Sequence, residues 1–110
     1  MKMHPTEAMI RMARFKKLCD EQQVVKTNLG ELSARLRAAE ERLVEVEADV
    51  LSHTPEQART RYLAISEFVA AQRNASDLFI LLGQLMRRSA DVIEPVMDSV
   101  RDDLKKHVDL

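Results

Sequence analysis

The chain has 110 residues, of which 45% are hydrophobic and 32% are charged, with 17 Lys and Arg against 18 Asp and Glu. The formal net charge of −1 disfavours a general electrostatic interaction with nucleic acid or with an anionic lipid surface. Two glycines, three prolines and an aromatic content of 4% are typical of a mostly helical protein with an aliphatic core. This length predicts one domain, residues 1–110.

We expect a soluble, cytoplasmic protein. Charged residues are spread through residues 1–14, which therefore lack the apolar segment of a signal peptide. The most apolar run, Leu78 to Met86, is about half as long as a membrane span requires. The chain has one cysteine, Cys19, so it cannot form an internal disulfide, which fits a reducing compartment.

The first predicted helix spans residues 5–52. Pro5 suits a first helical turn, and Glu7 then lies near the positive end of the helix dipole. A heptad repeat follows, with apolar residues at alternating spacings of three and four. Its members are Phe15, Leu18, Gln22, Val25, Leu29, Leu32, Leu36, Ala39, Leu43, Val46 and Val50. Only Gln22 is polar, so we expect this face to pack against another helix.

A turn is predicted at residues 53–54. Pro55 disfavours a helical conformation at Thr54, and the stretch from Thr54 to Gln57 forms a capping box with proline at the first helical position. So short a connection predicts an all-α antiparallel helical hairpin with coiled-coil-like packing. One long rod with a sharp kink is the alternative.

The second predicted helix spans residues 55–108, with a kink near Pro95. Its predicted packing stripe also alternates spacings of three and four: Ile65, Phe68, Gln72, Ala75, Phe79, Leu82, Met86, Ser89, Ile93, Val96 and Val100. The predicted register places Gln22 level with Leu82, so that a polar residue meets a large apolar one. A shift by one heptad would place Gln22 against Ser89, which is less favourable by this criterion.

A second row of apolar and small residues flanks this stripe, and the predicted hairpin leaves it without an intramolecular partner. The predicted partner-binding residues are Ala71, Leu78, Leu81, Gly83, Leu85, Ala90 and Val92. We therefore expect a homo-oligomer, most simply a dimeric four-helix bundle. The alternative is that this flank binds a helical segment of another protein.

No residue pattern predicts catalysis, a cofactor or a metal site. His4, His53 and His107 belong to no ligand pattern, and Asp103 with His107 offers only two ligands. The Glu-x-x-His signature of di-iron bundles is absent, as are phosphate-binding loops.

Three further residues have two interpretations each. Cys19 is interpreted as a small buried hydrophobe, with a redox role or an intermolecular crosslink as the alternative. Gln22 and Gln72 either fix the register of the helices or lie at hydrated edges of the core.

These patterns favour a non-catalytic protein–protein interaction module of a structural, adaptor or chaperone-like kind. One alternative is an elongated escort or stalk component of a secretion or export apparatus. The other is a small nucleic-acid-associated architectural protein that uses basic pairs such as Arg87 and Arg88. Acidic residues close to each basic pair make nucleic acid the less favoured partner.

Overall fold

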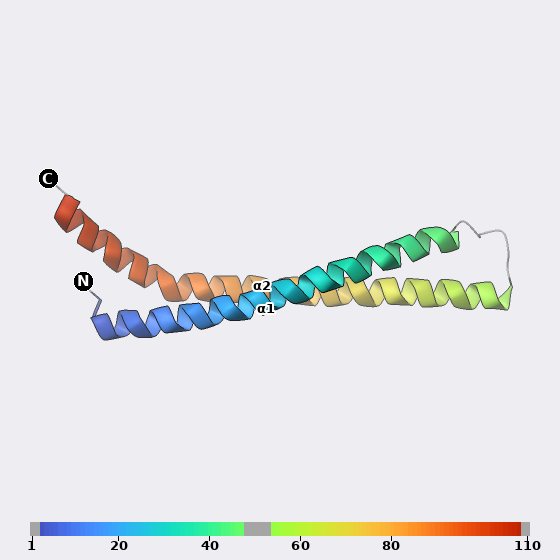
Figure 1. Ribbon diagram of the computed structural model, residues 1–110, viewed down its shortest axis with the longest axis horizontal. Coiled ribbons are helices and arrows are strands. Elements are labelled where there is room, and N and C mark those ends of the chain that lie inside the picture. Colours follow the sequence, from blue (N-terminus) through green and yellow to red (C-terminus); the bar gives the residue numbers. More distant parts are fainter. Residues whose placement is uncertain (1–2, 48–53, 109–110) are drawn as a thin grey trace. The chain divides into compact units, whose positions relative to one another are not determined.

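Two helices make up the secondary structure of residues 3–47 and 54–108, the part of the chain that the computed structural model describes. Helix α1 spans Pro5–Glu47, and helix α2 spans Pro55–Val108 (Figure 1). The predicted end of the first helix at residues 48–52, and His53 of the predicted turn, lie outside the described residues. Helix α2 continues past Pro95, and its ribbon bends in the orange part of Figure 1.

Side chains cap the first turn of each helix. The Thr54 N–H donates to Oε1 of Gln57 at 3.1 Å, and the Gln57 N–H donates to Oγ1 of Thr54 at 3.3 Å. These reciprocal bonds form the predicted capping box. At the start of α1, the Thr6 N–H donates to Nδ1 of His4 at 3.1 Å, so a histidine occupies the position that Ser, Thr, Asp or Asn usually takes.

The chain divides into two units, each with a segment of α1 and a segment of α2. The terminal unit comprises Met1–Val25 and Leu81–Leu110, and the middle unit comprises Lys26–Ile80. In Figure 1 the terminal unit contains the blue end of α1 and the orange and red end of α2, and the middle unit contains the teal, green and yellow segments.

The paired segments are antiparallel in both units. In the terminal unit, the Met3 N–H donates to Oγ of Ser99 at 3.4 Å, whereas Nε2 of Gln22 donates to Oγ of Ser89 at 2.9 Å. In the middle unit, Nη1 of Arg42 lies 2.7 Å from Oε2 of Glu67, and Asn28 lines one groove together with Asp77. Residue numbers rise along α1 as they fall along α2. The predicted helical hairpin is therefore confirmed.

The packed face of α1 is the predicted one. Every seam position with a described side chain is buried or half-buried: Phe15, Leu18, Gln22, Val25, Leu29, Leu32, Leu36, Ala39 and Leu43. The remaining two predicted positions, Val46 and Val50, lie outside the described side chains. Charged residues border the narrow apolar stripe of α1, so this helix has only one apolar face to bury.

The packed face of α2 differs from the predicted stripe. The residues of α2 that are buried or half-buried at alternating spacings of four and three, here called the packed seam, are Ala64, Phe68, Ala71, Ala75, Leu78, Leu82, Leu85, Ser89, Val92, Val96 and Ser99. Five of the eleven predicted positions, including Ile65, Phe79 and Met86, are instead exposed. Small residues on the packed seam allow α1 and α2 to approach closely, and this favours the observed face over the bulkier one.

The predicted register also set Gln22 against the wrong residue, because a buried amide needs a hydrogen-bonding partner. Gln22 is buried and bonds to buried Ser89, the pairing that the volume criterion disfavoured. Nε2 of Gln22 also donates to the carbonyl oxygen of Leu85 at 3.4 Å, and Oγ of Ser89 donates to that of Met86 at 2.9 Å. A buried amide without a partner costs about 1–3 kcal/mol, so pairing it with a hydroxyl outweighs filling space beside it.

Candidate functional site

The structure separates the seven predicted partner-binding residues into two groups. Ala71, Leu85 and Val92 are buried within their own units. Their prediction as an uncovered flank is therefore wrong, because they lie on the packed seam against α1. Leu78, another packed-seam residue, is half-buried.

The other three predicted residues remain accessible. Leu81 is 41% exposed, and Gly83 and Ala90 are exposed as well. A methyl group added at Gly83 would meet no other atom within 4 Å in the described part of the chain. Gly83 also lacks a positive φ angle, so the fold of this chain does not itself require glycine there.

A second heptad repeat on α2 lies beside the packed seam. It begins at Tyr62 and alternates spacings of three and four, as a packing face of a helix does. We call it the outer seam. In the middle unit its members are Tyr62, Ile65, Val69, Gln72, Ser76 and Phe79, and in the terminal unit they are Gly83, Met86, Ala90, Ile93, Met97, Val100 and Leu104.

Large apolar side chains of the outer seam are exposed in both units. In the middle unit Phe79 is 63% exposed, and in the terminal unit Met86 is 52% exposed beside Leu85, which is only 5% exposed. Met97 and Val100 are also more than half exposed. Sequence reasoning missed this surface because it assigned Met86 and Phe79 to the core. The repeat from Tyr62, in which only Gln72 and Ser76 are polar, is the signal that could have revealed it.

The middle unit has a shallow groove on this surface of α2. The groove has a volume of about 510 Å³. It is lined by Tyr62, Ile65, Ser66, Val69, Ala70, Arg73 and Asn74. The lining combines apolar side chains with a guanidinium and an amide, a composition that suits a protein side chain.

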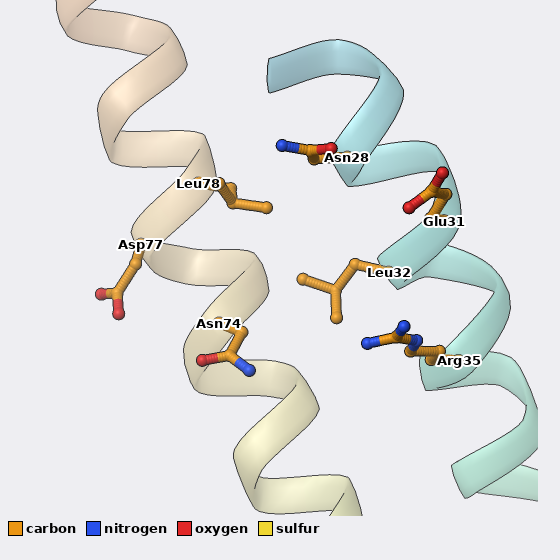
Figure 2. A pocket seen from close by; sticks show the side chains of 7 residues that line it. All are labelled: Asn28, Glu31, Leu32, Arg35, Asn74, Asp77 and Leu78. Carbon is orange, nitrogen blue, oxygen red and sulfur yellow. The ribbon is translucent and has the colours of Figure 1, made fainter. Parts of the chain in front are cut away.

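Two further grooves of the middle unit lie where α1 packs against α2. One has a volume of about 380 Å³ and is lined by Asn28, Glu31, Leu32, Arg35, Asn74, Asp77 and Leu78. Figure 2 shows Leu32 and Leu78 pointing into the gap between the two helices, with Arg35 extending toward the same gap. Its neighbour, of about 400 Å³, is floored by alanines of both helices, including Ala39 and Ala71. This groove exists because the alanine side chains are too small to fill the space between the helices.

The remaining chemical features are sparse. Cys19 is a half-buried free thiol in the terminal unit. Within the described residues, no three His, Cys, Asp or Glu side chains gather closely enough to hold a metal ion. Neither helix, over its described length, contains a stretch long and apolar enough to cross a membrane.

No protein-family model, no curated protein and no solved structure matches the chain. The interpretation of the site therefore depends on its own geometry.

Proposed function

We propose that the protein is a non-catalytic protein–protein interaction module that self-associates through the outer seam of α2. One observation carries this proposal: large apolar side chains recur at heptad spacing on a face of α2 that does not pack against α1. A helix with two adjacent apolar faces is typical of a helix with two helical neighbours. The hairpin provides one neighbour, and a second copy would provide the other.

The burial pattern of the chain supports this proposal. No large side chain of the described residues is fully buried, while Met86, Met97 and Val100 remain more than half exposed in the terminal unit. Covering such side chains is favourable, at about 25 cal/mol for each Å² of apolar surface removed from water. Two hairpins that share their outer seams would form a four-helix assembly, in which each α2 has two neighbours, its own α1 and the α2 of the second copy.

Sedimentation equilibrium tests the proposal directly. The wild type is compared with Met86→Glu/Met97→Glu at protein concentrations from roughly 5 to 500 µM, a range that covers micromolar dissociation constants. We expect a dimeric wild type and a monomeric but folded variant, because two buried carboxylates in each copy would oppose association. The matched control is Ile10→Glu/Val24→Glu, which changes two exposed apolar residues of the same unit outside the outer seam.

Two outcomes would contradict the proposal. A wild type that stays monomeric throughout this range would reject self-association. A Met86→Glu/Met97→Glu variant as dimeric as the wild type would show that another face is used. Circular dichroism of each variant distinguishes lost association from lost folding.

A further inference from the structure

We infer that two copies pair through the terminal-unit segment of α2 in an antiparallel arrangement, with Arg87 of each copy beside Glu94 of the other. This inference rests on the proposed self-association and specifies its geometry. It concerns only Gly83 to Leu104 of the outer seam, which belong to one unit.

The sizes of the outer-seam side chains in this segment match those of a second copy that runs in the opposite direction. Place a two-fold axis beside the helix, midway between Asp91 and Val92. The outer seam then meets its copy in layers, because an antiparallel pair sets residues before the axis level with residues after it. Gly83 lies level with Val100 of the second copy, and Ala90 with Ile93. A small residue therefore faces a branched one in each of these layers, and the flexible side chains of Met86 and Met97 fill the layer between them.

Charges beside the outer seam select this register. Arg87 and Glu94 each follow an outer-seam residue directly, are exposed, and take part in no ion pair within the described residues. In the proposed register they lie opposite one another across the interface, and two-fold symmetry repeats the pair. Opposite charges at such flanking positions are the usual determinant of partner orientation in paired helices.

Neighbouring registers place like charges together. A shift by one heptad in one direction brings Arg87 beside its own copy, and a shift in the other direction brings Glu94 beside its own copy. A parallel pair would place Arg87 and Glu94 of one copy on the opposite edge of the interface from the same residues of the other copy, so the Arg87–Glu94 pair would not form. The shifted registers bury similar apolar side chains but add repulsion, and the parallel pair loses the attraction, so the arrangement depends on electrostatic specificity.

The backbone and surroundings of Gly83 fit the proposed pairing. The isolated chain has room for a side chain there and an ordinary backbone conformation, yet glycine in a helix interior costs stability relative to alanine. The proposed pairing places the branched side chain of Val100 from the second copy over Gly83. A close approach by this second helix is a reason for glycine at this position.

Distances between identical spin labels test the arrangement. Labels are attached at Arg88→Cys or Asp102→Cys, both exposed, in a Cys19→Ser background. The two residues lie at different distances from the proposed axis. At 1.5 Å of helical rise for each residue, the label-to-label separation along the helices is about 10 Å for the first site and about 31 Å for the second. The lateral separation of the two helices adds to both distances, so we expect the measured distance at the second site to be longer by roughly 10–20 Å.

Charge exchange tests the register. Arg87→Glu or Glu94→Arg alone should weaken dimerisation about fivefold to tenfold, because each creates two like-charge contacts. The double exchange, Arg87→Glu/Glu94→Arg, should restore the dissociation constant of the wild type. Arg88→Glu, a change of equal charge outside the outer seam, is the control and should have the smaller effect.

The outcomes separate this inference from the function on which it rests. A dimeric wild type with equal label distances at the two sites would overturn the antiparallel arrangement and leave self-association intact. A longer label distance at the second site, together with no rescue by the double exchange, would overturn the register and leave the antiparallel arrangement intact. A monomeric wild type would overturn both.

Discussion

The terminal and middle units use different side chains to hold the same antiparallel pair of helices. In the terminal unit a buried amide and a buried hydroxyl, Gln22 and Ser89, bond across the core beside Leu85. In the middle unit the buried residues of α2 are alanines, and an exposed ion pair between Arg42 and Glu67 joins the helices. A buried hydrogen bond is available in one register only, whereas small apolar residues tolerate a shift.

The same difference predicts a gradient of local stability. The terminal unit buries Leu85 and Val92, whereas the buried packed-seam residues of the middle unit are Ala64 and Ala71. Leucine and valine remove more apolar surface from water than alanine does, and local opening depends on such burial. We therefore expect the terminal unit to specify the register and to contribute more stability than the middle unit.

Truncation of the terminal core should have the largest effect on this comparison. Leu85→Ala removes the large side chain that distinguishes the terminal packed seam from the alanine-lined middle one. We expect the free energy of unfolding to fall by about 2–4 kcal/mol in urea titrations followed by circular dichroism. Met86→Ala, the adjacent exposed residue, is the control and should change it by less than about 0.5 kcal/mol at concentrations where the protein is monomeric. Equal losses would contradict the assigned packed seam.

Loss of the buried polar pair should have an intermediate effect. Ser89→Ala leaves the Gln22 amide with only its long contact to the Leu85 carbonyl oxygen, at 3.4 Å. We expect a loss of about 1–2 kcal/mol, the usual cost of an unsatisfied buried polar group. Gln22→Leu/Ser89→Ala removes both partners and should recover much of that loss in a double-mutant cycle. No coupling in the cycle would show that the two side chains do not depend on one another.

The surface ion pair of the middle unit should have the smallest effect. Arg42 and Glu67 approach to 2.7 Å, but about half of each side chain is exposed. Solvent screening limits such pairs, so Arg42→Ala should change the free energy of unfolding by less than about 0.5 kcal/mol. The measurement is the same urea titration at low and high salt. A loss as large as that of Ser89→Ala would mean that the ion pair, and not the alanine packing, holds the middle unit together.

Sequence reasoning identified the packed face of α1 and the extent of α2 but chose the wrong face of α2, because the apolar patterns of the two helices differ in width. Along α1, charged residues such as Glu21 and Lys26 border a narrow stripe, so only one face can pack. Along α2 the residues at Leu85 and Met86 are both apolar, and two adjacent seams fit the same periodicity. The spacing of apolar residues alone does not choose between two such seams.

The register could have been inferred from one residue. Gln22 is the one polar member of the predicted seam of α1, and a buried amide requires a hydrogen-bonding partner. Ser89 is a polar residue within reach on α2, at the heptad shift that volume complementarity disfavoured. Polar pairing therefore outranks volume matching where a core contains few polar groups. The exposed apolar residues of the outer seam then follow from the residues that this register leaves outside the core.

The most direct test of two seams on α2 compares neighbouring residues by thiol labelling. Leu85→Cys and Met86→Cys, each in a Cys19→Ser background, are exposed to a maleimide reagent at several protein concentrations. We expect slow labelling of Leu85→Cys at every concentration, because α1 covers it. We expect fast labelling of Met86→Cys in dilute solution and protection as the concentration rises, because a second copy then covers the outer seam. Equally fast labelling at both positions, or protection of Met86→Cys that does not depend on concentration, would contradict this account.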